Sequence, residues 1–297
     1  MLRFILGASG VGKTTYIYDE IINDSIKNMD KQYILLVPDQ FTMETQKDIV
    51  NIHPNNGTMN IDILSFTRLA FRVFEELGIS KMSILDDTGK TLLLRHAIEK
   101  SKDKLKLFAD KYKYFGFVEE MKSSISELYQ YGIASEQLEK AIEDTKDHKT
   151  TSMKLYDIKI IYEAFKEEVK SISDENNTYI TKEEVLSKLC EVIGSSKIVK
   201  DSIIYLDGFT GFTPVQNRLL GLLMECASQV NMAVTLPKED CVGLTSTGFV
   251  DIKDHELFAM SKKTINSLMS IGADRNITTA EPVILDGKSG SRFNGKE

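Results

Sequence analysis

The feature that most constrains this chain is a stretch of eight residues near its start, Gly7 to Thr14, with the sequence GASGVGKT. It fits the pattern GxxxxGK[ST] at every fixed position, and it lies between a short apolar run, Leu2 to Leu6, and a segment with helical spacing, Thr14 to Asn28. A strand, a tight turn and a helix in this order are the context in which such a loop binds phosphate. We therefore predict a phosphate-binding loop; the alternative is a glycine-rich turn with a chance lysine.

The residue types in this loop suit a bound triphosphate. Glycines let the backbone curl so that successive N–H groups face the β-phosphate, at the positive end of the following helix. Lys13 would bridge the β- and γ-phosphates, and the Thr14 hydroxyl would take one coordination site of Mg²⁺. The predicted nucleotide-binding residues are Gly7, Ala8, Ser9, Gly10, Val11, Gly12, Lys13 and Thr14.

A second site residue is predicted from a strand far along the chain. Ile203 to Leu206 has strand composition and is followed by Asp207, a position from which an acid holds the magnesium of a phosphate-binding loop. Asp207 and Gly208 are also a favoured turn pair, so a plain turn is the alternative. Gly208 stands where a hydrolytic motor usually has a Glu that orients the attacking water, and this predicts nucleotide binding without brisk hydrolysis.

The order of apolar segments predicts an α/β fold. Continuous apolar runs at 33–37, 59–64, 198–206 and 230–236 alternate with helical patterns at 42–52, 66–77 and 214–228, which indicates a parallel sheet covered on both faces. From 80 to 196 apolar residues recur every three or four positions, so we expect a large α-helical insertion there. The predicted divisions are a discontinuous core of 1–79 and 197–286, an insertion of 80–196, and a linker or disordered tail of 287–297.

Composition narrows the class of protein. The 37 Lys and Arg against 44 Asp and Glu give a net charge of -7, which argues against wrapping nucleic acid by bulk charge, so any DNA contact requires a local surface. The three cysteines show no CxxC spacing that would build a disulfide framework or a metal site, and a reducing cytoplasm fits them best. No run approaches the roughly 18 apolar residues of a membrane span, and no secretory leader is recognisable.

Four segments together resemble the N-terminal region of AddB, the B subunit of the bacterial AddAB helicase–nuclease. They are the loop, Val37 to Thr42, Ile63 to Leu69 and Asp207 to Gln216. Their order matches the UvrD-like helicase core, and the resemblance covers nearly the whole chain. In active helicases the last motif begins Asp-Glu and ends with a Gln nine residues after the Asp. Asp207 and Gln216 keep its two ends, which makes Gln216 a candidate contact to the γ-phosphate or to water, whereas Gly208 departs from the pattern of a motor.

The resemblance implies a P-loop NTPase core of the RecA-like type that binds ATP, Mg²⁺ and mainly single-stranded DNA. It implies a heterodimer with an AddA-type subunit, which drives translocation in double-strand-break repair and recombination. An exonuclease domain with an iron–sulfur cluster would lie beyond Glu297, and none of the three cysteines corresponds to the ligands of that cluster. The chain itself is therefore expected to have little or no ATPase and no nuclease activity.

The predicted DNA contacts follow the second and third strands, because open α/β sheets bind ligands at the carboxyl ends of their strands. The candidates are Gln40, Phe41, Thr42, Ser65, Phe66 and Arg68. Phe41 and Phe66 also fit positions in a core. A basic and aromatic segment, Arg95 to Phe117, fits either single-strand binding or a solvated helix with core aromatics.

Two other functions stay open at this point. A P-loop kinase acting on a small molecule would need an arginine-rich lid, and the sequence shows no convincing one. A nucleotide-independent interaction scaffold is the other, and the intact Lys13 and Thr14 argue against it.

Overall fold

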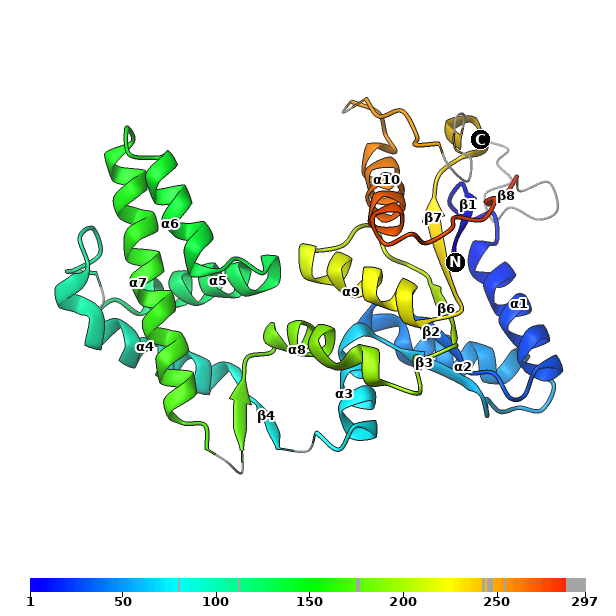
Figure 1. Ribbon diagram of the computed structural model, residues 1–297, viewed down its shortest axis with the longest axis horizontal. Coiled ribbons are helices and arrows are strands. Elements are labelled where there is room, and N and C mark those ends of the chain that lie inside the picture. The colour runs from blue at the N-terminus through cyan, green and yellow to red at the C-terminus, as the bar shows by residue number, and fades with distance from the viewer. Residues whose placement is uncertain are drawn as a thin grey trace. The chain divides into compact units, whose positions relative to one another are not determined.

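The computed structural model of the chain describes residues 1–79, 81–111, 113–174, 177–241, 244, 248–253 and 255–286. Two compact units are present, one formed by Met1–Gly78 with Leu189–Glu297 and the other by Ile79–Lys188. The first contains the main sheet and the second is largely helical (Figure 1). The tail expected at 287–297 lies outside the described residues.

Six parallel strands form the main sheet, in the order β3-β2-β6-β7-β1-β8. The predicted α/β fold with a parallel sheet is thus confirmed. All but β8 correspond to the apolar runs noted above, and every residue of β2 is buried, as expected for a strand covered on both faces. The strands are β1 (Leu2–Gly7), β2 (Tyr33–Leu36), β3 (Ile61–Leu64), β6 (Ile203–Leu206), β7 (Gln229–Thr235) and β8 (Val283–Leu285).

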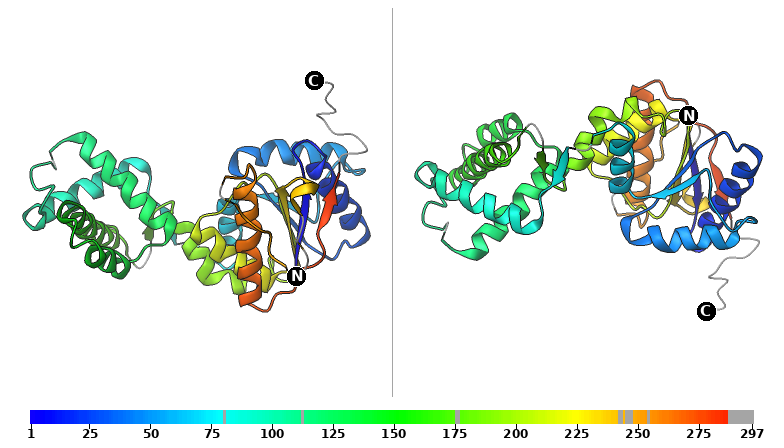
Figure 2. Two further views of the ribbon diagram at one scale, coloured as in Figure 1. Left: turned by 90° about the horizontal axis from the view of Figure 1, so that it is seen from above. Right: turned by 90° about the horizontal axis from the view of Figure 1, so that it is seen from below.

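Helices cover both faces of this sheet (Figure 2). Apolar side chains of α1 and α2, among them Ile17, Ile21 and Ile49, pack with Leu35 and Tyr205 on one face. On the opposite face α9 and α10 contact β7, and α3 contacts β3. The helical elements of this unit are α1 (Lys13–Lys27), η1 (Asp39–Phe41), α2 (Thr42–Ile52), α3 (Phe66–Glu76), η3 (Ile193–Ser195), α9 (Pro214–Cys226), η4 (Lys238–Cys241) and α10 (Ala259–Asp274). Helix α8 (Glu184–Val192) begins in the second unit and ends in this one.

A carboxylate holds together the two chain stretches that build the sheet unit. Glu76, in the last turn of α3, accepts hydrogen bonds from Ser196 Oγ at 2.5 Å, Lys197 N at 2.6 Å and Ile198 N at 3.2 Å. Glu76 precedes the point where the chain leaves this unit, and Ser196 follows the point where it returns. These hydrogen bonds therefore hold the segment that leaves the sheet unit next to the segment that returns to it.

The second unit is a helical bundle. An apolar cluster that includes Leu94, Met121, Ile161 and Phe165 forms its core. Two short strands of the same unit, β4 and β5, form a two-stranded parallel sheet. The elements are β4 (Met82–Ile84), α4 (Asp87–Ser101), η2 (Lys102–Lys104), α5 (Phe115–Tyr131), α6 (Ser135–Asp144), α7 (Lys149–Ser171) and β5 (Thr178–Ile180).

The basic and aromatic segment lies in this bundle. Asp157, fully buried on α7, accepts hydrogen bonds from the backbone N–H groups of Lys106, Leu107 and Phe108 at 2.7 to 2.9 Å. The rings of Phe108 and Phe117 are buried with their centroids 5.0 Å apart. These two aromatics thus serve the core, as the second interpretation of the segment expected.

Among the described residues, no helix combines the length and apolar character needed to cross a lipid bilayer. The three cysteines are free thiols; Cys190 and Cys241 are buried and Cys226 is half-buried.

Candidate functional site

The glycine-rich loop joins β1 to α1 in a conformation that glycine favours. Gly10 has a φ of 77° and Gly12 a φ of 91°, both in the left-handed region that L side chains rarely adopt. Gly12 is the N-cap of α1, and no side chain caps the helix there. The first turn of α1 therefore offers backbone N–H groups and a positive dipole end to an anion in the loop.

Lys13 is held inside the loop by backbone carbonyls. Its Nζ donates to Gly7 O at 2.9 Å and to Ala8 O at 2.8 Å. Burial lowers the pKa of this ammonium group below its usual value, and the negative charge of Asp207 opposes that shift. The ammonium group of Lys13 is thus partly shielded from water and lies beside the N-terminal end of α1. Both features favour a negatively charged ligand in the loop.

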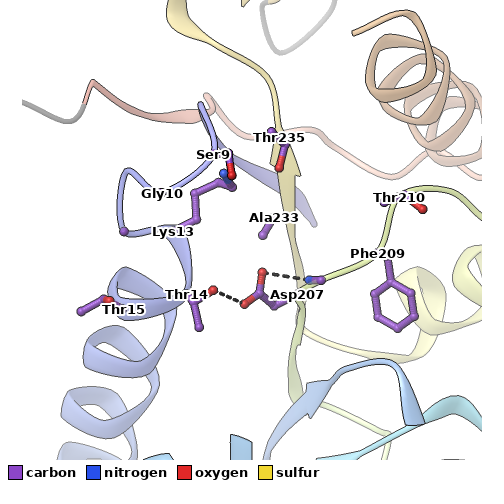
Figure 3. A pocket seen from close by; sticks show the side chains of 12 residues that line it. Ser9, Gly10, Lys13, Thr14, Thr15, Asp207, Phe209, Thr210, Ala233 and Thr235 are labelled. Carbon is purple, nitrogen blue, oxygen red and sulfur yellow. Dashed lines mark hydrogen bonds between the residues drawn. The ribbon is translucent and has the colours of Figure 1, made fainter. Parts of the chain in front are cut away.

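Asp207 meets the loop from the carboxyl end of β6. Its Oδ2 accepts a hydrogen bond from Thr14 Oγ1 at 2.6 Å, although 193 positions separate the two residues in the sequence. Its Oδ1 accepts from Gly208 N at 2.9 Å (Figure 3). β7 lies between β6 and β1 in the sheet, so the carboxylate reaches across one strand at the edge where all carboxyl ends meet.

The loop and Asp207 border an open cleft with a volume of about 510 Å³. Its lining includes a hydroxyl and a carboxylate, the hard oxygen donors that Mg²⁺ prefers. The lining residues are Ser9, Gly10, Gly12, Lys13, Thr14, Thr15, Asp207, Gly208, Phe209, Thr210, Ala233 and Thr235.

Gln216 lies elsewhere, at the start of α9. It forms a capping box with Thr213: Gln216 Oε1 accepts from Thr213 N at 2.9 Å, and Thr213 Oγ1 accepts from Gln216 N at 3.3 Å. Gln216 is outside the set of residues that line the cleft. Its side-chain oxygen is therefore engaged in starting a helix.

The candidate DNA contacts fall into two groups. Gln40 and Arg68 are exposed, and Phe41 is 42% exposed, so these side chains are accessible to a ligand. Thr42, Ser65 and Phe66 are buried and serve the structure. Thr42 Oγ1 donates to Asp39 O, Ser65 Oγ accepts from Arg68 N, and the Phe66 ring packs on Phe209 and Phe212 at centroid distances of 5.2 and 6.2 Å.

The six candidates follow β2 and β3, which are neighbours in the sheet. β2 and β3 pair in parallel with Leu36 opposite Leu64, so their carboxyl ends lie side by side. Gly208 lies close enough to Phe41 that a Cβ added at Gly208 would be 3.9 Å from the Phe41 ring. The accessible candidates therefore lie at the same edge of the sheet as Asp207.

Two contributors to this region did not stand out from the sequence. Thr235 ends β7 directly opposite Gly7 and lines the cleft. Arg3 on β1 donates to Glu20 of α1 at 2.6 Å and to the buried Asn231 of β7 at 2.7 Å, which ties the strand before the loop to the helix after it. The position of Thr235 at the end of a strand could have marked it as a site residue from the sequence. The contacts of Arg3 could not be predicted, because they depend on which strands are neighbours in the sheet.

The fold and this site together define an α/β protein with a parallel sheet, whose glycine-rich, lysine-containing loop faces an aspartate across an open cleft. Residues 4–297 match the family described as "ADDB, N-terminal", and the chain belongs to this family. The resemblance inferred from the motifs is thus confirmed.

Three relatives carry names that describe them as the B subunit of an ATP-dependent helicase/deoxyribonuclease. The protein of Lachnoclostridium phytofermentans is 40% identical over 97% of this chain, that of Clostridium novyi 31% over 98%, and that of Acetivibrio thermocellus 29% over 98%. The match covers 24% of each relative, so the chain spans about a quarter of their length.

Proposed function

We propose that the chain is the nucleotide-binding N-terminal part of an AddB-type component of an ATP-dependent helicase/deoxyribonuclease, built on a P-loop NTPase core. The observation that carries this proposal is the hydrogen bond of 2.6 Å between Thr14 and Asp207. Two residues of the types that hold Mg²⁺ beside a triphosphate, separated by most of the chain, lie together at the mouth of a lysine-containing loop. The names of the relatives, which include "ATP-dependent", support the choice of nucleotide.

In this proposal the loop residues Gly7 to Thr14 surround the phosphates. Lys13 exchanges its two carbonyl partners for phosphate oxygens, which relieves the cost of holding an ammonium group away from water. Thr14 and Asp207 hold Mg²⁺, which would neutralise part of the phosphate charge.

Hydrolysis by this chain is proposed to be slow. The residue after Asp207 is Gly208, which carries no side chain to orient water, and its φ of 78° disfavours any other residue. A missing general base commonly costs a factor of about 10² to 10⁴ in rate. Gln216, the other candidate for this role, would have to leave its capping box before it could contact a phosphate or water.

DNA and partner contacts form the outer part of the proposal. Single-stranded DNA would pass over the carboxyl ends of β2 and β3, where Gln40, Phe41 and Arg68 are accessible. An aromatic face and a cation are what stacking and phosphate contact require. An AddA-type subunit would supply the motor, in a cytoplasmic complex for double-strand-break repair and recombination, and the sheet core of 1–79 and 197–286 would carry the nucleotide.

The test is binding of a fluorescent ATP analogue to the purified chain. Binding should require Mg²⁺, and Lys13→Ala should abolish it, because the loop then loses the charge that meets the phosphates. Lys27→Ala, at the exposed far end of the same helix, is the matched control and should bind as the unmodified chain does. Equal binding by Lys13→Ala and the control would refute the proposed function.

A further inference from the structure

A second hollow opens on the other side of the glycine-rich loop. It has a volume of about 350 Å³ and is lined by Ala8, Val11, Pro237, Lys238, Glu239, Leu285 and Asp286. Ser9, Gly10 and Gly12 of the same loop line the first cleft. Neighbouring loop residues thus line different hollows.

The floor of the second hollow is tightly packed. A Cβ at Gly7 would lie 2.6 Å from Val11 Cγ2 and 2.9 Å from Leu285 O, closer than real Cβ contacts come. β8 pairs with β1 so that Leu285 lies opposite Gly7, and Leu236 N donates to Gly7 O at 3.1 Å. The loop, β8 and the end of β7 are therefore fitted together, with Gly7 as the residue that permits the fit.

The rim of this hollow is also anchored. Glu239 belongs to the short helix η4, in which Asp240 N donates to Pro237 O at 3.0 Å. Asp240 pairs with Lys262 of α10 at 3.2 Å, and the buried Cys241 lies with its Sγ 3.2 Å from Pro237 O. Glu239 therefore lies on a turn that closes on itself and is tied to α10 through Asp240 and Lys262.

The lining combines apolar walls with carboxylates. Ala8, Val11, Pro237 and Leu285 offer aliphatic surface, which suits the face of a flat ring. Glu239 and Asp286 accept hydrogen bonds, and Lys238 adds a positive charge on the same rim. A flat heterocycle with an exocyclic amino group satisfies both requirements.

We infer that this hollow receives the base of the bound nucleotide and selects a base that carries an amino group at position 6. The inference rests on the proposed function, because the phosphates must occupy the loop for the base to reach the far side. Adenine would donate its amino hydrogens to Glu239 or Asp286. Hypoxanthine carries a carbonyl oxygen at that position, which would face the same carboxylates without a hydrogen bond and with unfavourable charge.

The expected size of this selection follows from one hydrogen bond to a charged group. Such a bond contributes enough to change affinity by about tenfold or more. MgATP should therefore bind the chain at least about tenfold more tightly than MgITP, which differs from it only at the base. Magnesium tripolyphosphate, which has no base, reports on the loop alone.

The experiment compares these three probes on three forms of the chain. The test form carries Glu239→Gln and Asp286→Asn, which keep size and remove both negative charges. The control form carries Asp30→Asn and Glu281→Gln, the same change of charge at exposed residues that precede β2 and β8 and so lie at the opposite edge of the sheet. Competition against a fluorescent ATP analogue gives the three affinities.

The inference predicts that the preference for MgATP over MgITP falls to about twofold or less in the test form and persists in the control form. Tripolyphosphate should bind all three forms equally. Equal binding of MgATP and MgITP by the unmodified chain, or a preference unchanged in the test form, would overturn the inference and leave the loop assignment standing. Failure of all three probes to bind would instead overturn the proposed function, and the inference with it.

Discussion

Replacement of Asp207 by Asn tests the metal-holding role of this carboxylate without disturbing the fold. Asn has the same shape, so its Oδ1 can still accept from Gly208 N, and its amide can donate to Thr14 Oγ1. Both partners are partly exposed, so the free energy of unfolding should change by less than about 1 kcal/mol. What the variant lacks is one negative charge at the mouth of the loop.

The loss of magnesium affinity follows from that charge. Two unit charges about 4 Å apart interact by about 1 kcal/mol in water and by about 4 kcal/mol at an effective dielectric constant of about 20, and a divalent ion doubles these values. The cleft is open and Asp207 is half-buried, so the lower value applies. Asp207→Asn should therefore weaken Mg²⁺-dependent ATP binding by about 2 kcal/mol, or about 30-fold.

The assay is a titration with a fluorescent ATP analogue, in excess Mg²⁺ and again with a chelator. The variant and the unmodified chain should differ in the first condition and coincide in the second. Asp30→Asn, which removes the same charge from the loop before β2 at the far edge of the sheet, should behave as the unmodified chain. Unchanged affinity of Asp207→Asn in Mg²⁺ would show that this carboxylate does not hold the metal.

Three further predictions concern DNA, hydrolysis and the joint between chain stretches. The double variant Gln40→Ala with Arg68→Ala should weaken salt-dependent binding of a single-stranded oligonucleotide, measured by anisotropy. Arg72→Ala, one turn further along α3, should leave this binding unchanged. If the double variant and Arg72→Ala changed the affinity equally, the DNA path would have to lie elsewhere. The unmodified chain should show slow or undetectable ATP turnover in a phosphate-release assay, because Gly208 offers no side chain to orient water; rapid turnover would contradict this. Gly208→Glu should lower stability by about 1–2 kcal/mol, because the φ of 78° strains any other residue. Glu76→Ala should lower the free energy of unfolding by about 1–2 kcal/mol, since it removes the charged acceptor shared by Ser196 Oγ and the N–H groups of Lys197 and Ile198. The exposed neighbour Glu75→Ala should change it by less than about 0.5 kcal/mol in the same denaturant titration.

The parts of the fold that could be predicted are those with strong local signals. The loop, α1, β2 and β6 come from apolar runs, glycine spacing and helical periodicity within short windows. Among the elements that escaped prediction, which include β4 and β5, two show the physical reasons. β8 has only three residues and exists through its pairing with β1, and α10 carries Lys262 on its buried face, which interrupts the apolar pattern.

The residues of the site also divide into those that local sequence patterns predict and those that they do not. The residues of the loop and Asp207 were predicted from motif and strand end, and the structure brings them together. Gln216 shows the opposite case, because the spacing of Thr213, Pro214 and Gln216 is also the signature of a capping box, with proline in the first turn. Asp157 and Glu76 could not be found from sequence, since a carboxylate that accepts backbone N–H groups from a distant segment leaves no local pattern.

The site joins two separate stretches of chain within the sheet unit. Thr14 belongs to the stretch before the helical unit and Asp207 to the stretch after it, and β6 and β7 of the second stretch lie between β2 and β1 of the first. A ligand held by both residues therefore links two stretches that the chain itself joins only through the helical unit. Any ligand that binds only the folded state adds RT ln(1 + [L]/Kd) to stability. Glu76 links the same two stretches without a ligand, at the point where the chain leaves and returns. The proposed nucleotide would thus stabilise the same assembly of strands as this joint, from the opposite edge of the sheet, because Glu76 meets the segment before β6 and Asp207 follows that strand.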